Sequence, residues 1–250
     1  MDLQLKGRTA LVTGASSGIG REIARGLARE GVRVAITGRR RQNLDSLAAE
    51  LAAEGAAAPV IVVHDAMEAG YVEAVAAQST AALGPIQILV NNAGGSRAFG
   101  KDATDEQWDE ALTLNFTRHR QLTNRLLPGM IEGRWGRVIN ITGKSEPDNV
   151  NGAFCAKAAL TAWSKGLSRE VGPHGITVNC IPPGRILSDQ ILRNYTPEYR
   201  AWQSEHEIPM GRYGNPGELA DLAVFLASPR AGYITGAVYP VDGGLRRYQY

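Results

Sequence analysis

Short apolar segments rich in β-branched residues alternate along the chain with longer segments whose apolar residues recur at helical spacing. Apolar runs of this length are typical of parallel strands covered on both faces, and the segments between them are typical of crossover helices. The runs are Thr9–Thr13, Arg33–Thr37, Pro59–Val63, Ile86–Asn91, Gly136–Ile141, Gly175–Cys180 and Ala237–Val241. The pattern predicts an α/β fold: a doubly wound (Rossmann), seven-stranded parallel sheet with helices on both faces.

The segments between the runs each carry one apolar stripe. Ile19, Ile23 and Leu27 follow the first run at intervals that place them on one face of a helix. Glycine follows three of these segments, where a left-handed residue would end a helix, at Gly31, Gly55 and Gly84. Because no linker, repeat or low-complexity segment interrupts the alternation, we expect one domain over residues 1–250.

A glycine-rich stretch, G-x-x-x-G-x-G, joins the first run to the first helical segment. This context indicates a nucleotide-binding loop, since the glycines allow a tight turn and a close backbone approach, and the helix N-terminus attracts phosphate. The predicted contacts are Gly14, Ser16, Ser17, Gly18, Ile19 and Gly20. A turn that serves only tight packing is the alternative.

The end of the second run indicates which dinucleotide would bind. About twenty residues past the last glycine, an acidic residue would hold a free ribose 2′-hydroxyl. This chain has Gly38-Arg39-Arg40-Arg41 there, without a carboxylate. Guanidinium groups can grip a 2′-phosphate, so we predict NADP, with Arg39 as the first contact and Arg40 beside it. Three solvated arginines at a helix start are the alternative.

The amino-acid composition limits which kinds of protein this chain can be. The chain has 250 residues, 44% of them hydrophobic and 21% charged, which is enough to bury a full core. Its 27 Lys and Arg nearly balance 25 Asp and Glu, which argues against a nucleic-acid partner. Cys155 and Cys180 fit free thiols, and the four His and two Cys show no metal-ligand spacing. Without a signal-peptide pattern or a membrane-spanning run, we expect a soluble, cytoplasmic protein.

Further motifs follow in a recognisable order. After the fourth run comes Asn91-Asn92-Ala93-Gly94, then Asn115, Lys157, Pro183-Gly184 and Ser188, and the chain closes with 225–228 (Phe-Leu-Ala-Ser) and 241–244 (Val-Asp-Gly-Gly). Together with the glycine-rich loop, this order resembles a classical short-chain dehydrogenase/reductase and is similar to the 3-oxoacyl-carrier-protein reductases. The resemblance runs from Lys6 to Leu245.

The resemblance implies further cofactor contacts. Asp65 and Ala66 would lie near the adenine, and residues Asn91 through Gly94, Ala93 among them, along the adenosine side. Ile186 and Ser188, after Pro183 and Gly184, would lie at the nicotinamide carboxamide, and Lys157 at the nicotinamide ribose. Asp65 could instead be a plain turn residue, and Asn91 could simply end a strand.

The resemblance also implies how a carbonyl would be reduced. In the family a tyrosine phenol donates the proton, a serine binds the carbonyl oxygen, a lysine lowers the pKa of the phenol, and an asparagine holds a water. Lys157 and Asn115 match the lysine and the asparagine. Four residues before Lys157, where the tyrosine would share its helix face, the chain has Ala153. Phe154 points about 100° away and has no hydroxyl.

The serine position falls on Thr142 or Gly143, and the stretch from there to Lys157 is shortened. Three interpretations stay open. In the first, a replacement donor supplies the proton, with Ser145, Lys144 or a water held by Asn115 as candidates, and turnover falls by about 10²–10⁴-fold. In the second, Lys144 and Lys157 bind a carboxylate or sugar acid, with Glu146 as acid or base. In the third, the protein binds NADP(H) without chemistry.

The segment from Ser188 to Gly211 resembles the family's variable substrate-covering helices. Its aromatic residues would form an apolar lid, and they are Tyr195, Tyr199, Trp202 and the neighbouring His206. Tyr195 could supply a phenol from this lid, although packing explains it as well. Arg185 and Arg193, with Lys144, could recognise an anionic substrate or be rim charges.

Helical segments over Trp108–Leu127 and Lys157–Val171 match the surfaces on which relatives form tetramers. Trp163 or Leu167 exposed on a monomer would leave an apolar patch, so we expect a homotetramer of 222 symmetry. The leading hypothesis is therefore an NADP(H)-dependent oxidoreductase that interconverts a small carbonyl compound and its alcohol. Its catalytic candidates are Lys157, Asn115 and Ser145. The alternatives are an NADP(H)-binding pseudoenzyme and a non-redox lyase or isomerase.

Overall fold

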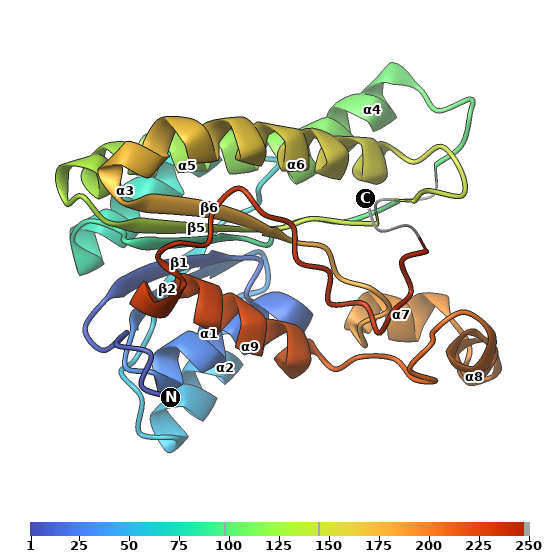
Figure 1. The fold of residues 1–250 in the computed structure, drawn as a ribbon, viewed down its shortest axis with the longest axis horizontal. Helices are drawn as coiled ribbons and strands as arrows, with labels where there is room; N and C mark the ends of the chain where they lie inside the picture. Colours follow the sequence, from blue (N-terminus) through green and yellow to red (C-terminus); the bar gives the residue numbers. More distant parts are fainter. Residues whose placement is uncertain (98, 145, 248–250) are drawn as a thin grey trace.

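A parallel sheet forms the centre of the molecule in the computed structural model, which describes residues 1–97, 99–144 and 146–247 (Figure 1). Its strand order is β3-β2-β1-β4-β5-β6. The strands are β1 (Thr9–Thr13), β2 (Arg33–Gly38), β3 (Val60–Val63), β4 (Ile88–Asn91), β5 (Gly136–Ile141) and β6 (Ile176–Ile181). The order reverses between β1 and β4, and this makes the fold doubly wound, as predicted.

Helices cover both faces of this sheet. One face carries α1 (Gly18–Arg29), α2 (Arg41–Ala53) and α9 (Pro216–Ala227). The other carries α3 (Tyr71–Leu83), α4 (Asp105–Leu112), α5 (Arg118–Glu132) and α6 (Gly152–Val171), with a π-helical turn, η1 (Thr113–Thr117), between α4 and α5. Two short helices, α7 (Asp189–Asn194) and α8 (Pro197–His206), project beyond the carboxyl ends of the strands (Figure 1). Single 3-10 turns, η2 (Gly172–His174) and η3 (Pro229–Ala231), follow α6 and α9.

The core lies in two layers, one on each side of the sheet. Strand β1 shows why: Ala10 and Val12 pack into the layer under α1 and α9, while Leu11 packs into the opposite layer. Successive side chains of a strand point to opposite faces, so a strand buried on both faces must be apolar throughout. Unbroken apolar runs therefore predicted these strands correctly.

The prediction of a seventh strand is wrong. Residues 237–241 run parallel to β6, with bridges from Val238 to Cys180 and from Val241 to Pro183, but they form no regular strand. Pro182, Pro183 and Pro240 lie in this ladder, and proline has no N–H to donate to it. The sheet of the described residues thus has six strands rather than seven.

Two of the predicted helix ends have the expected geometry. Gly31 and Gly55 follow α1 and α2 with φ of 78° and 75°, in the left-handed region that glycine adopts without a steric penalty. The predicted apolar patch on α6 is absent, because Leu167 is only 8% exposed and Trp163 packs on the core and edge-on against Phe116. Among the described helices, none is both long and apolar enough to cross a membrane.

Candidate functional site

A cleft of about 420 Å³ opens along the carboxyl ends of the strands, where the strand order reverses. Ligands of open α/β sheets bind in this position. Predicted cofactor residues that line the cleft are Gly14, Ser16, Ser17, Gly18, Ile19, Arg39, Arg40, Asp65, Ala66, Ala93, Gly94 and Ser188. Asn92, expected on the adenosine side, and Arg193, expected at an anionic substrate, also line the cleft. Residues at the same edge that sequence reasoning missed are Thr37, Gly38, His64, Met67, Tyr71, Gly95, Arg97 and Leu114. Several of them lie at or just after the carboxyl ends of strands β2, β3 and β4, and this position in the sequence could have predicted them.

Two glycines of the glycine-rich loop are required by its close packing, within the loop and against the segment after β4. A Cβ on Gly20 would lie 2.3 Å from the Asn92 Nδ2 atom, and one on Gly14 would lie 2.8 Å from the Ala93 Cα atom. Helix α1 begins directly after Ser17 and has no acidic residue in its first turn. Its N-terminal N–H groups and partial positive charge therefore face the cleft without a competing carboxylate, which fits a dinucleotide phosphate.

Thr13 and Asn92 join the loop after β1 to the loop after β4. The Thr13 hydroxyl accepts from the backbone N–H groups of Asn92 and Ala93, at 2.9 and 3.0 Å, and donates to the Val90 carbonyl. The Asn92 amide donates in turn to the Thr13 carbonyl at 3.0 Å. Sequence reasoning missed Thr13, because a threonine that ends an apolar run carries no distinctive signal.

The arginines after β2 lie beside the phosphate loop. Arg40 donates to the Ser17 hydroxyl at 2.8 Å and to the Ser16 hydroxyl at 3.4 Å. Arg39 pairs more loosely with Asp65, at 3.5 Å. Two guanidinium groups therefore border the cleft where the family binds the adenosine ribose, and this suits a 2′-phosphate.

The other predicted cofactor residues lie next to this cleft rather than along its lining. Asn91 is fully buried in β4, and its amide donates to Thr123 and Asn140. Ile186 is buried and bridges to Gly214. Pro183 and Gly184 line a separate small cavity of about 40 Å³.

Lys157 extends from α6 to the turn at Gly94, and Gly94 lines the cleft. Its ammonium donates to the Ile141 carbonyl at 2.7 Å. A Cβ placed on Gly94 would lie 3.3 Å from Lys157 Nζ and 2.9 Å from Asn115 Oδ1, so both side chains converge on the same turn of the chain. Burial lowers the pKa of Lys157 to about 8, against a smaller opposing effect of Cys180. An ammonium with this pKa can exchange a proton near neutral pH.

Asn115 is held in place by the π-helical turn between α4 and α5. Its amide donates to the carbonyls of Ala111 and Gly95, at 2.9 and 3.0 Å, and its Oδ1 atom accepts from the Gly95 N–H at 3.1 Å. A π-helical turn inserts an extra residue into the helix and is frequent at functional sites. The structure thus brings the side chains of Asn115 and Lys157 to the same turn of the chain.

Ala153 and Gly143 both precede Lys157 in the chain and lie close to it in the folded protein. Ala153 is in the first turn of α6, 8% exposed, one helical turn before Lys157. A Cβ on Gly143 would lie 3.5 Å from both Cβ and Cγ of Lys157, an ordinary contact distance. Both backbone positions are therefore close to the lysine, and neither carries a hydroxyl.

The segment after β5 packs against the end of the chain. Lys144 forms an ion pair with Asp148, and Glu146 accepts from the Arg247 backbone N–H at 3.1 Å and lies 3.8 Å from the Arg246 guanidinium. Lys144, Glu146 and Arg246 line the small cavity with Pro183 and Gly184. Ser145, the third predicted catalytic candidate, lies outside the described residues.

The residues predicted to face the substrate mostly contact one another. Arg185 bonds to Glu207 at 3.1 Å and lies over the Tyr195 ring at 5.8 Å. Along α8 the Tyr199 and Trp202 rings are stacked, as are those of Trp202 and His206. Arg185 therefore has a carboxylate partner already, which weakens the prediction that it receives an anionic substrate. In the described part of the chain, no cluster of three or more His, Cys, Asp or Glu residues could hold a metal ion.

His119 is an additional titratable group beneath the site, one helical turn after Asn115. It is 2% exposed, and its Nε2 atom has no hydrogen-bond partner among the described residues. Burial, and secondarily the charge of Lys157, hold the pKa of His119 well below its usual value, against a raising effect from a hydrogen bond with the Ala93 backbone. Its imidazole is therefore neutral at physiological pH.

A six-stranded doubly wound sheet with a phosphate loop at its reversal point, and a buried lysine beside an asparagine, defines a dinucleotide-binding α/β protein. Residues 14–246 match the family described as enoyl-(acyl carrier protein) reductase. The chain belongs to the short-chain dehydrogenase/reductase family, as the sequence motifs predicted.

Individual relatives cover the whole chain. It is 37% identical to the 3-oxoacyl-(acyl-carrier-protein) reductase FabG of Pseudomonas aeruginosa, over 97% of this chain and 99% of that protein. It is 34% identical to a galactitol 2-dehydrogenase (L-tagatose-forming) of Cereibacter sphaeroides, over 96% of each. Among solved structures, L-sorbose reductase of Gluconobacter frateurii, complexed with NADPH and L-sorbose, superposes with a TM-score of 0.93 at 32% identity, over 99% of this chain and 100% of that chain.

Proposed function

We propose that this protein is an NADP(H)-dependent oxidoreductase that interconverts a small carbonyl compound and its alcohol, with a proton relay that lacks the usual tyrosine. One observation carries the proposal: a single cleft runs from the Arg40–Ser17 contact at one end to the turn at Gly94, beside Lys157 and Asn115, at the other. The first end suits a phosphate group, and the second suits proton exchange.

The cofactor of this chain is NADP(H). Support comes from the N-terminus of α1, which lines the cleft at Gly18 and Ile19, from Arg39 and Arg40 beside the cleft, and from the NADPH complex of the sorbose reductase. Bound NADP(H) supplies the hydride. Gly14 through Gly20 would hold its pyrophosphate, and Arg39 and Arg40 its 2′-phosphate. Asp65, Ala66, Asn91, Ala93 and Gly94 would lie on its adenosine side, and Pro183, Gly184, Ile186, Ser188 and Lys157 at its nicotinamide half.

The proton moves through Lys157. Its ammonium is buried, its pKa of about 8 lies near the operating range, and Asn115 lies at the same turn of the chain. Without a phenol at position 153, the relay consists of Lys157, Asn115 and a hydroxyl or water, with Ser145 as a further candidate. Loss of one positioned acid typically lowers turnover by about 10²–10⁴-fold, so this relay supports slow turnover.

Relatives that act on sugars and sugar alcohols indicate which substrates to test first. The two named above are a sorbose reductase and a galactitol dehydrogenase. We propose a polyhydroxylated ketone and its alcohol as the first substrate class. A homotetramer is proposed on the family resemblance alone.

The test separates binding from chemistry. Calorimetry with the purified protein should show NADPH binding more tightly than NADH, and a panel of ketoses, with sugar alcohols for the reverse direction, should change the nicotinamide absorbance. Failure to bind either dinucleotide overturns the proposal.

The second candidate is an NADP(H)-binding protein without chemistry, which the absence of hydroxyl side chains at positions 143 and 153 favours. Tight NADPH binding with no turnover across the panel would support it. Substrate conversion without a change in nicotinamide absorbance would instead support a lyase or isomerase.

A further inference from the structure

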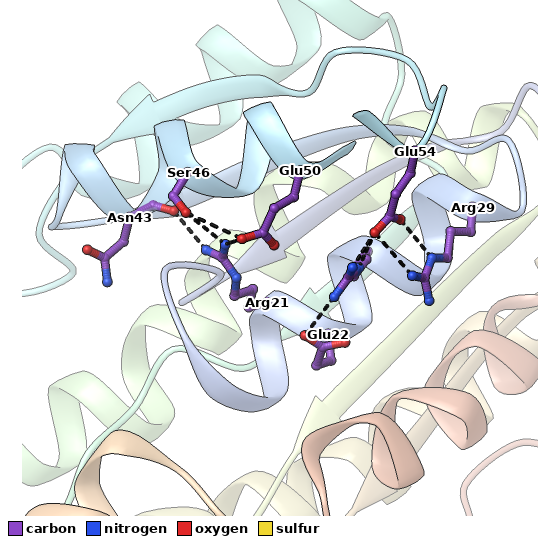
Figure 2. Close-up of polar contacts among 8 residues, drawn as sticks. Arg21, Glu22, Arg29, Asn43, Ser46, Glu50 and Glu54 are labelled. Atoms are coloured by element: carbon purple, nitrogen blue, oxygen red, sulfur yellow. Dashed lines mark hydrogen bonds and ion pairs between the residues drawn. The ribbon is translucent and has the colours of Figure 1, made fainter. Parts of the chain in front are cut away.

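Two groups of ion pairs join α1 to α2, at opposite ends of the helix pair (Figure 2). One group centres on Arg21, near the start of α1, and includes Asn43, Ser46 and Glu50 of α2. The other centres on Glu54, just past the end of α2. The Arg21 group lies close to the phosphate loop, and the Glu54 group lies away from it.

Arg21 reaches across to α2 and meets it at three points between the first and the third turn. Its guanidinium donates to the Asn43 carbonyl at 2.9 Å, to the Ser46 hydroxyl at 3.1 Å and to the Glu50 carboxylate at 2.7 Å. The Arg21 side chain is only 17% exposed. Because the planar guanidinium meets three acceptors at once, it fixes the start of α2 relative to α1.

Asn43 continues the connection into the phosphate loop. Its amide Nδ2 donates to the Ser16 carbonyl at 3.2 Å, while its own carbonyl accepts from Arg21. Ser16 leads directly into α1, which carries Arg21. These contacts therefore close a ring from the loop through α2 and back to α1.

This ring encloses the turn that carries the arginines. Residues 38–41 lead from β2 into α2, and Arg40 in this turn donates to the Ser17 hydroxyl. The turn also packs closely, since a Cβ on Gly38 would lie 3.2 Å from the Ser16 Cβ atom. The position of the Arg40 guanidinium over the loop thus depends on how α2 is held.

We propose that Arg21 and Asn43 are positioning residues for dinucleotide selectivity: they hold the start of α2 against the phosphate loop, so that Arg40 faces the 2′-phosphate. This inference rests on the proposed NADP(H) function. The pyrophosphate contacts of the loop serve both dinucleotides, whereas the arginine turn serves only NADPH. A loosened turn therefore weakens NADPH binding and leaves NADH binding nearly unchanged.

The chain provides a matched control. Glu54 accepts from Arg29 at 2.8 Å and forms an ion pair with Arg25, so it also joins the two helices. These arginines hold the pKa of Glu54 down to about 2. Removing this group loosens the same helix pair away from the arginine turn.

The experiment measures the Kd of NADPH and of NADH by calorimetry for Asn43→Ala, Arg21→Met and Glu54→Gln. The ratio Kd(NADH)/Kd(NADPH) should fall by about threefold to tenfold in the first two variants, as expected for one lost hydrogen bond. It should stay within about twofold of wild type in Glu54→Gln, although the urea midpoint of that variant falls. Asn43→Ala changes no charge, so its loss of selectivity would not be electrostatic.

Two outcomes overturn the inference: an unchanged ratio in both Asn43→Ala and Arg21→Met, or an equal drop in Glu54→Gln. Arg21→Lys, which keeps the charge but not the planar fork, is the milder variant if Arg21→Met fails to fold. A wild-type protein that prefers NADPH, while both Asn43→Ala and Arg21→Met retain the ratio, refutes only this inference. A wild-type protein that binds neither dinucleotide refutes the proposed function as well.

Discussion

The two ends of the cleft are built in different ways. At the phosphate end, backbone geometry dominates: Gly14 and Gly20 leave no room for a side chain, and Thr13 and Asn92 tie together the loops after β1 and β4. At the other end a few side chains, chiefly Lys157 and Asn115, converge on the turn at Gly94. Phosphate binding therefore depends on many contacts, whereas proton transfer depends on single side chains.

This difference explains how one fold serves many reactions. A phosphate group bound by backbone N–H groups depends on the path of the chain, so the binding site persists as long as the loop does. Proton transfer depends on one ionisable group at one position, and a single substitution removes it. Function therefore has to be argued from the chemical end, even when the fold and the cofactor cleft are clear.

The largest expected effect comes from restoring the missing side chains. The double variant Gly143→Ser/Ala153→Tyr should raise the kcat for ketone reduction by about 10²–10⁴-fold, since it adds a positioned acid beside Lys157. A serine Cβ at position 143 would meet the stem of Lys157 at 3.5 Å, an ordinary contact. Steady-state turnover of a ketose panel with NADPH is the measurement.

The same double substitution in a Lys157→Met background serves as the control and should give no gain. An unchanged kcat in the Gly143→Ser/Ala153→Tyr protein, with NADPH binding intact, would show that the surrounding geometry serves another reaction.

At the phosphate end, Arg39→Ala and Arg40→Ala test which guanidinium holds the 2′-phosphate. Loss of a charged hydrogen bond costs about 1.5–3 kcal/mol, so the responsible variant should weaken NADPH binding by about ten- to a hundredfold and leave NADH binding unchanged. Arg41→Ala is the matched control, because Arg41 pairs with Asp45 on the surface of α2. Calorimetric Kd values that match wild type in both variants would argue against NADP selectivity.

The pH dependence of turnover examines the chemical end directly. Burial lowers the pKa of Lys157 from 10.5 to about 8, so the ammonium is protonated below pH 8 and loses its proton above it. Carbonyl reduction consumes a proton, so kcat should fall about tenfold per pH unit above 8. A profile of kcat against pH that stays flat through 8 would remove Lys157 from the relay. Residual turnover of Lys157→Met should lack the inflection.

The smallest expected effect concerns His119, which lies beneath the turn at Ala93 and Gly94. Its folded-state pKa lies well below the usual 6.5, so below that pH the unfolded chain binds a proton that the folded chain does not. The free energy of unfolding should therefore fall as the pH drops below about 6.5, by up to about 1.4 kcal/mol per unit.

Urea unfolding at two pH values, on either side of 6.5, would measure this dependence. His119→Gln should flatten it, while His206→Gln, at an exposed position, should retain the wild-type slope. Equal slopes in all three proteins would mean that His119 titrates normally in the folded chain.

Local pattern predicted much of the fold and of the cofactor cleft. Buried strands read as unbroken apolar runs, and the glycine-rich loop followed from a strand, a helix and the spacing between them. The missing seventh strand depended on prolines in two segments that meet only in the folded chain. Contacts such as Asn43 to Ser16 or Arg247 to Glu146 join residues far apart in sequence, and no local sequence pattern predicts them.

The packing of residues 242–247 against the segment after β5 has a practical consequence. The Arg247 backbone meets Glu146 at the rim of the small cavity, next to Pro183 and Gly184. Affinity tags and fusion partners should therefore be attached at the N-terminus, which lies among the helices of the opposite part of the molecule (Figure 1).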